Sequence, residues 1–242
     1  MKKIIITSII LTLSFSVNAQ SWWSNKKVRG NGNVTTETRK TSDYESVSSA
    51  GNFDVKLVAG AEGKITLRGE ENLMQYIITE VKKGKLTIKV KKNVNLRMTK
   101  KFVVTVPYRD INAVALAGSG DVSNTGTIKS DNMKIALAGS GDINLRIDAG
   151  KIKTSIAGSG NIKLNGNSAA LTCSIAGSGD ISAYGLNTKS IVVSVAGSGN
   201  VKTTVSESIK VRVAGSGSVY YKGKPDKIDS KSTGSGSVID RN

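Results

Sequence analysis

The tetrapeptide Ala-Gly-Ser-Gly recurs along the second half of the chain and constrains the fold more than any other feature. It begins at Ala117, Ala138, Ala157, Ala176, Ala196 and Ala214, and a Thr-Gly-Ser-Gly variant begins at Thr233. Successive copies are 21, 19, 19, 20, 18 and 19 residues apart. A near-constant period of this length is typical of proteins in which each repeat is one structural unit stacked on the next.

Apolar residues alternate in a fixed register around each copy. In the copy that begins at Ala138, Met133, Ile135 and Leu137 precede the alanine at every second position, and Ile143 follows the corner. The residues between them are small, polar or charged, and the other copies follow the same pattern. A period of two with many β-branched residues predicts one half-buried strand on each side of a Gly-Ser-Gly corner.

The repeats differ in length in only one segment. From five residues before to seven residues after the first residue of the tetrapeptide, every copy has the same length, whereas the segment that joins two copies has five to eight residues. This favours a solenoid, because coils must stack along paired strands while loops can bulge outward. Seven coils would extend about 34 Å at roughly 4.8 Å each. An antiparallel meander with a hairpin at each corner is the alternative fold.

Residues 41–110 are also rich in strand patterns, but they lack the tetrapeptide. Alternating segments occur at 53–58, 64–67, 85–90 and 102–107, and residues 71–81 fit either a short helix or an irregular strand. We interpret 41–110 as an irregular N-terminal part of the solenoid, and 111–242 as its regular part. Residues 20–40 are rich in Asn, Gly, Thr and Lys, which predicts a flexible segment.

The first 19 residues have the organisation of a signal peptide. Lys2 and Lys3 precede an apolar stretch over 4–17, and Val17-Asn18-Ala19 offers small residues for cleavage. We therefore expect a mature chain that begins at Gln20 and is exported to the periplasm, the outer surface or the medium. No later segment approaches the eighteen apolar residues of a membrane-spanning helix, so we expect no transmembrane segment in the mature chain.

The composition removes several catalytic and metal-binding chemistries. The chain has no histidine, and its one cysteine, Cys173, occupies an apolar position of the repeat. Histidine-assisted nucleophiles and the usual zinc sites are therefore excluded, and Cys173 is predicted to be a small buried hydrophobe. We predict no catalytic residue, metal or cofactor. The alternative is a carbohydrate-active enzyme on a pectate-lyase-like β-helix, which joining segments of five to eight residues disfavour because they leave little material for a cleft.

The chain is strongly basic. It contains 35 Lys and Arg residues against 18 Asp and Glu, and after removal of residues 1–19 its net charge is +15. The densest basic stretch contains Lys82, Lys83, Lys85, Lys89, Lys91 and Lys92. It could bind anionic polysaccharide or lipopolysaccharide, or it could keep exposed strand edges from pairing with other molecules. Nucleic acid is not an expected partner, because aromatic residues for base stacking are scarce.

One polar residue follows every Gly-Ser-Gly corner. These residues are Asp121, Asp142, Asn161, Asp180 and Asn200, and the last two copies have Ser218 and Ser237. Stacked coils would align them as a corner ladder with neighbours roughly 5 Å apart. The ladder could hold Ca²⁺ or supply paired acids for sugar-bond cleavage, or its side chains could bond the backbone of their own turns. Replacement of Asp by Asn and Ser along the ladder favours the structural role.

Several fragments, among them 52–57, 84–88 and 104–107, together with the serial Gly-Ser-Gly-Asp/Asn motif, resemble the head-GIN-domain family of auto-transporter adhesins. The resemblance covers residues 41–238. It implies an all-β, right-handed, parallel β-helix-like solenoid that is secreted by Bacteroidetes-type bacteria, and it supplies no catalytic residues. We therefore predict an exported, non-catalytic module that binds polymers or builds structure at the cell envelope.

Overall fold

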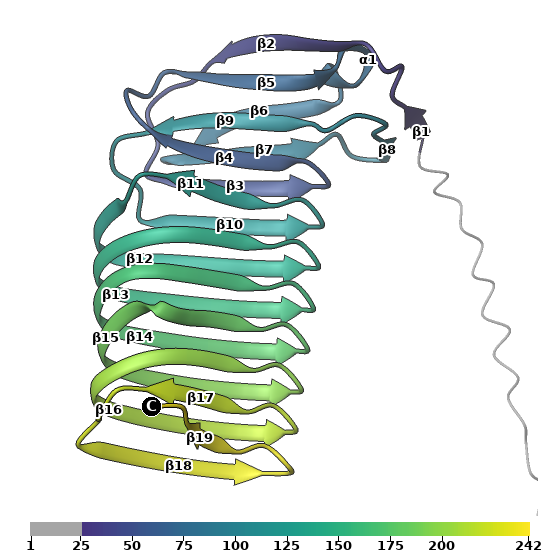
Figure 1. The fold of residues 1–242 in the computed structure, drawn as a ribbon. Helices are drawn as coiled ribbons and strands as arrows, with labels where there is room; N and C mark the ends of the chain where they lie inside the picture. Colours follow the sequence, from purple (N-terminus) through teal and green to yellow (C-terminus); the bar gives the residue numbers. More distant parts are fainter. Residues whose placement is uncertain (1–25) are drawn as a thin grey trace, which may run out of the picture.

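The computed structural model describes residues 26–242, so the predicted signal peptide and residues 20–25 lie outside the described part of the chain. Figure 1 shows a tall stack of strands that wind into successive coils. No helix in the described part is long and apolar enough to cross a membrane. The one helix, α1, spans Glu71–Met74.

The regular part of the stack winds in the order of the chain. Its strands are β10 (Ala113–Gly118), β11 (Val122–Thr125), β12 (Ile128–Gly139), β13 (Ile143–Gly158), β14 (Ile162–Gly177), β15 (Ile181–Gly197), β16 (Val201–Gly215), β17 (Val219–Lys222), β18 (Lys227–Thr233) and β19 (Val238–Asp240). In each coil a forward segment leads into the Gly-Ser-Gly corner and a return segment leaves it. Neighbouring coils pair in parallel, with Ala138 opposite Ala157 and Ala157 opposite Ala176. The predicted parallel solenoid is confirmed, and the antiparallel meander is wrong for the repeats.

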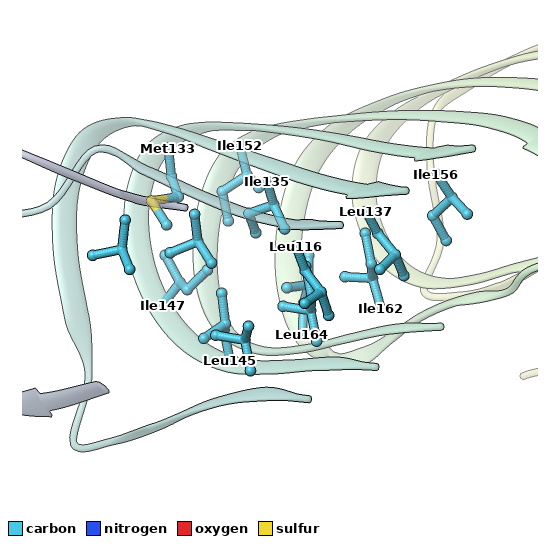
Figure 2. Packing of buried hydrophobic residues seen from close by; sticks show 14 of the residues in the cluster. Leu116, Met133, Ile135, Leu137, Leu145, Ile147, Ile152, Ile156, Ile162 and Leu164 are labelled. Atoms are coloured by element: carbon cyan, nitrogen blue, oxygen red, sulfur yellow. The ribbon is translucent and has the colours of Figure 1, made fainter. Parts of the chain in front are cut away.

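The predicted apolar positions form columns of buried side chains inside the coils (Figure 2). Ile135, Thr154, Cys173 and Val193 occupy one column, and each is almost fully buried. Burial of such columns removes apolar surface from water and holds successive coils together. The last coil differs: Ile228 occupies a column position but is 49% exposed.

Stacking also requires the two glycines at each corner. Gly158 has φ +131°, and a Cβ atom there would lie 2.4 Å from the carbonyl oxygen of Gly139 in the preceding coil. A Cβ atom on Gly160 would lie 2.0 Å from the Gly141 oxygen. The Gly139 carbonyl instead accepts the N–H groups of both Ser159 and Gly160 at 3.0 Å. Both glycines therefore let successive corners approach within hydrogen-bonding distance.

The N-terminal part of the stack does not follow the order of the chain. Its parallel strands are β3 (Ser46–Gly51), β4 (Asp54–Ala59), β7 (Lys85–Val90) and β9 (Val103–Tyr108). The coil formed by β3 and β4 pairs with β10 and β11 on one side and with β7 and β9 on the other. The coil of β7 and β9 thus lies farther from the regular repeats than the coil of β3 and β4, although it comes later in the sequence. After β9 the chain crosses back over the coil of β3 and β4 to begin the regular repeats at β10.

Antiparallel strands close this end of the solenoid. They involve β2 (Val34–Lys40), β5 (Lys64–Glu70) and β6 (Ile77–Lys82), with β2 pairing β5, β5 pairing β9 and β6 pairing β7. A short parallel pair, β1 (Lys26–Arg29) and β8 (Val94–Arg97), lies beside them. The segment at 64–67 is therefore a strand as predicted, but it belongs to this cap and not to a parallel coil.

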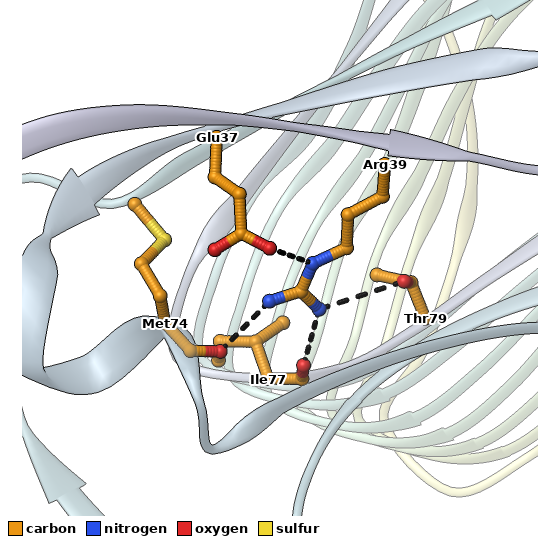
Figure 3. Close-up of polar contacts among 5 residues, drawn as sticks. All are labelled: Glu37, Arg39, Met74, Ile77 and Thr79. Atoms are coloured by element: carbon orange, nitrogen blue, oxygen red, sulfur yellow. Dashed lines mark hydrogen bonds and ion pairs between the residues drawn. The ribbon is translucent and has the colours of Figure 1, made fainter.

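The prediction of a flexible segment over 20–40 is wrong for residues 26–40. All seven residues of β2 pair with β5. Arg39 also binds across the cap: its guanidinium donates to the carbonyl oxygens of Met74, at 2.9 Å, and Ile77, and it pairs with Glu37 at 2.7 Å (Figure 3). The prediction rested on the polar composition of the segment, which carries no information about contacts with residues distant in sequence.

A buried carboxylate joins three parts of the cap. The fully buried Glu70 side chain accepts the N–H groups of Gly32, Thr99 and Lys100 and the hydroxyl of Thr99. Burial opposes ionisation of this carboxyl, yet these hydrogen bonds outweigh it and lower the pKa of Glu70 to about 2. Gly30 leaves the room for it, since a Cβ atom there would lie 2.0 Å from the carboxylate.

Candidate functional site

The corner ladder forms as predicted, but its hydrogen bonds run between coils. The Oδ1 atom of Asp121 accepts the backbone N–H of Asp142 at 3.0 Å, and Oδ1 of Asp142 accepts the N–H of Asn161 at 3.0 Å. Asn161, Asp180, Asn200 and Ser218 continue the series in the same way. The expectation that each side chain bonds its own turn is wrong, because the N–H that it reaches belongs to the equivalent residue of the next coil.

The alternation of Asp and Asn in the ladder has a geometric reason. The Asn161 side-chain amide donates to Oδ1 of Asp142 at 3.0 Å, and that of Asn200 donates to Oδ1 of Asp180 at 3.1 Å. Asn161 thus separates the carboxylates of Asp142 and Asp180, and each asparagine supplies the preceding aspartate with a donor. Within residues 26–242, no group of three or more Cys, Asp or Glu side chains gathers as a metal site would require. The hydrogen bonds between coils give the ladder side chains a structural use.

One ladder member was missed in the sequence. The Oδ1 atom of Asp54 accepts the N–H of Asp121 at 3.1 Å, and its Oδ2 atom pairs with Lys101 at 2.9 Å. Asp54 follows Ala50-Gly51 at the spacing that separates Asp121 from Ala117-Gly118. That spacing was the available signal, although Phe53 replaces the second corner glycine.

The structure divides the predicted basic stretch into paired and unpaired lysines. Glu80 lies between Lys82 at 2.7 Å and Lys89 at 2.8 Å, and hydrogen bonds from these two ammonium groups lower the pKa of Glu80 to about 2. Lys85 is exposed on β7, the same strand as Lys89. Lys82, Lys83, Lys91 and Lys92 are also exposed, and of these four only Lys82 has an ion pair with a residue that the structure describes. Lys83, with φ +50°, lies with Gly84 in the turn between β6 and β7.

Cys173 has the surroundings of a structural residue. It is completely buried between Thr154 and Val193 in the neighbouring coils. Burial raises the pKa of its thiol to about 12, so the nucleophilic thiolate is suppressed.

A groove that the sequence did not predict follows the segments that join the coils. Its volume is about 680 Å³, and small side chains line much of it, among them Ala149, Ser168, Ala169, Thr188 and Val205. Lys189 and Lys224 lie at its border, and Lys189 is 3.7 Å from Glu207. Short joining segments with small residues create this hollow, which is open to solvent along the side of the solenoid.

The chain matches known structures over most of its length. A "putative adhesin" from Bacteroides fragilis has a TM-score of 0.82 at 23% identity, over 88% of this chain and 100% of the other. A "putative lipid binding protein" from Parabacteroides distasonis has a TM-score of 0.75 at 28% identity, over 90% and 100%. A "putative adhesin" from Parabacteroides merdae has a TM-score of 0.71 at 23% identity, again over 90% and 100%.

A comparison with curated proteins finds no significant match. The model of one protein family, described as "Putative auto-transporter adhesin, head GIN domain", matches residues 43–225. The matched region begins just before β3 and ends after β17, so it contains the irregular coils and most of the regular repeats. Since this match spans well over half of the sequence, the chain belongs to the head GIN domain family.

Proposed function

We propose that this protein is an exported, non-catalytic, adhesin-like module that binds anionic polymers, such as acidic polysaccharide or lipopolysaccharide, at the cell envelope. Membership of an adhesin family and the similarity to adhesin-like structures support a binding role outside the cytoplasm. The predicted signal peptide supports export, to the periplasm, the outer surface or the medium.

The observation that carries the proposal is the group of unpaired cations in the basic stretch. In the described part of the chain, the ammonium groups of Lys83, Lys85, Lys91 and Lys92 have no carboxylate within ion-pair distance, in contrast to Lys82 and Lys89. Lys83 and Lys85 lie at one end of β7, and Lys91 and Lys92 follow its other end, so they form two pairs of neighbouring cations. Charges interact over only about 8 Å at physiological ionic strength, so cations within a pair act together on a polyanion more than scattered lysines do. These four lysines form the first candidate contact surface.

The positions of the cysteine thiol and of the ladder carboxylates support the proposal that the protein is not catalytic. The ladder carboxylates already accept hydrogen bonds from the next coil, which is a structural use. The Cys173 thiol is buried inside the solenoid, away from any substrate. Asp121 and Asp142 are adjacent carboxylates of the ladder, and each already accepts a backbone N–H of the next coil through Oδ1, whereas Asp142 and Asp180 are separated by Asn161. Paired acids for glycoside cleavage must instead face a bound sugar.

Lipid binding is a second candidate function. The Parabacteroides distasonis structure described as a "putative lipid binding protein" resembles this chain over 90% of its length. The groove of about 680 Å³ is the feature that favours it, because its small, largely apolar lining could receive an acyl chain while Lys224 meets an anionic headgroup.

Retention on immobilised heparin and lipopolysaccharide, measured across a salt gradient, tests the main proposal. We expect the mature protein to bind both matrices and to elute as salt rises. Reversal of Lys83, Lys85, Lys91 and Lys92 to Glu should lower the affinity by about tenfold, since like charges brought together at a contact are strongly unfavourable. Lys89 is left intact because its reversal would place a second carboxylate beside that of Glu80.

The melting temperature of this variant must match that of the parent, as expected for exposed positions. An unmodified protein that passes through both matrices at low salt would refute anionic-polymer binding. Preferential binding to zwitterionic lipid vesicles, lost on Ala169→Lys at an exposed position of the groove, would instead support the lipid candidate.

A further inference from the structure

The return segments present two neighbouring columns of outward side chains along one face of the solenoid, and cations recur in both. The outward positions of this face, which we call the return-strand face, are the sixth and eighth residues after the first residue of each tetrapeptide, or after Ala50 in the coil of β3 and β4. They include Lys56, Arg146, Lys163, Lys202, Lys222 and Arg241. The register places Lys163 opposite Ser182, Ser182 opposite Lys202 and Lys202 opposite Tyr220. From the coil of β3 and β4 to the last coil, no Asp or Glu occupies these outward positions.

Two tyrosines hold cations in place at the C-terminal end of this face. The Lys222 ammonium lies 5.2 Å from the centre of the Tyr184 ring, and the Arg241 guanidinium lies 5.2 Å from that of Tyr220. Burial raises the pKa of Tyr184 while the charge of Arg241 opposes this rise, so the two pairs are close enough to interact. A cation held over a ring is positioned without losing charge to a carboxylate, and its N–H groups remain available to an anion.

An irregularity in the strand pairing places Tyr184 here. Ala183 pairs with Thr203, but the next pair along the strands is Asn187 with Thr204, so residues 184–186 have no partner in β16. Bulges of this kind redirect a side chain and are common beside functional sites. The coil that contains Tyr184 has 20 residues, one more than the preceding coil and two more than the following one. The bulge thus coincides with the one place where aromatic and cationic side chains interleave on this face.

We infer that the return-strand face is the surface on which the protein binds an extended acidic polysaccharide. The inference rests on the proposed function, and it assigns polymer binding to the return-strand face instead of to the basic stretch. The face from Lys56 to Arg241 crosses eight coils and is about 34 Å long, at roughly 4.8 Å a coil. That length suits a linear polyanion better than a single headgroup, and the outward positions between the cations are mainly Ser, Thr and Asn.

The forward segments of the same coils provide the contrast. Their outward positions carry a column of small residues next to each corner, such as Ala138, Ala157 and Ala176, and Arg212 there is paired with Asp229 at 2.7 Å. Cations also occur on the forward side, including Lys134, Lys151 and Lys153, but tyrosine rings hold none of them in place. These three lysines supply a matched control for charge.

The test compares two triple variants of the full mature protein by calorimetry with polygalacturonate, a carboxylate polymer. One carries Lys163→Glu, Lys202→Glu and Lys222→Glu; the control carries Lys134→Glu, Lys151→Glu and Lys153→Glu. Both lower the net charge by the same amount at exposed positions. We expect the return-strand variant to lose affinity by about tenfold or more and the control to lose less than about threefold, because screening limits the effect of distant charges.

A milder pair of variants tests the role of the ring. Tyr184→Leu should weaken binding by about two- to fivefold, since it removes the cation–π contact that holds Lys222. Tyr184→Phe keeps the ring and should bind as the parent does. Melting temperatures of all variants show whether any loss is one of folding.

The outcomes separate the inference from the proposed function. Equal losses in the two triple variants, or a loss confined to reversal of Lys83, Lys85, Lys91 and Lys92, would overturn the return-strand face while leaving anionic-polymer binding intact. Failure of the unmodified protein to bind polygalacturonate, heparin or lipopolysaccharide would overturn both. Binding to vesicles containing phosphatidylglycerol, but to no free polymer, with the same loss in the return-strand variant, would assign the face to a membrane and refute the polysaccharide.

Discussion

The Oδ1 atom of Asp142 accepts two hydrogen bonds from Asn161, one from its backbone N–H and one from its side-chain amide, each at 3.0 Å. The two residues are 19 positions apart in sequence and occupy the same corner of neighbouring coils. A polar side chain on the surface thereby satisfies a backbone donor that the strand pairing leaves without a partner at the corner. The same hydrogen bond recurs between successive coils along the stack. The ladder therefore fixes the register of the coils on their outer surface, and the apolar columns fix it in the interior.

Removal of the Asp142 side chain should therefore destabilise the solenoid. Asp142→Ala leaves both Asn161 donors without this acceptor and should lower stability by about 1–2 kcal/mol. Asp142→Asn keeps an acceptor oxygen at the same place and should cost less. Urea unfolding followed by circular dichroism measures the difference, and an alanine variant as stable as the parent would show that water replaces the bond without loss.

The same geometry predicts little dependence on calcium. One oxygen of each ladder side chain already has a donor in the next coil, and within residues 26–242 no three acidic side chains gather to surround a cation. A chelator should move the melting temperature by less than about two degrees, because a site that is weak or empty contributes little linkage energy. A large fall in melting temperature that Asp142→Asn abolishes would instead identify the ladder as a Ca²⁺ site.

The corner glycines should tolerate substitution much less than the serine between them. A Cβ atom on Gly160 would lie 2.0 Å from a backbone oxygen, which cannot move without separating the coils. We expect Gly160→Ala to cost more than about 2 kcal/mol, within the range of overpacking and backbone strain. Ser159→Ala, at the exposed neighbouring position, should stay within about 0.5 kcal/mol and serves as the control.

The regular coils could be predicted from the sequence because their signal is local and repeated. Alternation around Leu137, Ile156 and Ile175 specifies which face of each strand is buried, and the constant spacing specifies which strands are neighbours. The ladder positions follow from the same register. Once coils stack in parallel, residues at equivalent positions must be adjacent.

The cap could not be predicted in this way because its contacts are not periodic. The pairing of β2 with β5 joins residues such as Arg39 and Ile65, and no sequence pattern links these two segments. Nor does the alternation of apolar residues reveal that β7 and β9 lie outside β3 and β4. A parallel strand has the same alternation pattern whichever neighbour it pairs with. The return-strand face was missed for a related reason: its cations are scattered in the sequence and meet only through the stacking.

The position of Cys173 inside the solenoid gives a direct check on the register. Because the thiol is buried and its pKa is raised to about 12, native protein should not react with a maleimide at neutral pH. Denatured protein should react fully. Ser178→Cys in a Cys173→Ala background places a thiol at an exposed corner and should react at once. Rapid labelling of Cys173 in the native state would place that column on the outside and contradict the fold.

The buried Glu70 carboxylate predicts how the cap responds to acid. Its pKa is lowered from 4.5 to about 2, so the folded state holds the ionised form more strongly than the unfolded chain does. The stabilisation is fully present above the unfolded pKa of 4.5 and is lost as the pH falls through the folded pKa of about 2. The melting temperature should therefore decline across this interval, as the hydrogen bonds from Thr99, Gly32 and Lys100 lose their ionised acceptor.

Glu70→Gln isolates this contribution. The amide has one acceptor oxygen in place of two, and its NH₂ group would face backbone donors, so the variant should be less stable than the parent at neutral pH. Because glutamine does not titrate, the difference in melting temperature between parent and variant should shrink steadily from about pH 5 to pH 2. Glu71→Gln, at the exposed neighbouring position, should retain the parent's acid dependence. A parent and a Glu70→Gln variant that lose stability in parallel over this range would show that other carboxyl groups govern the acid response.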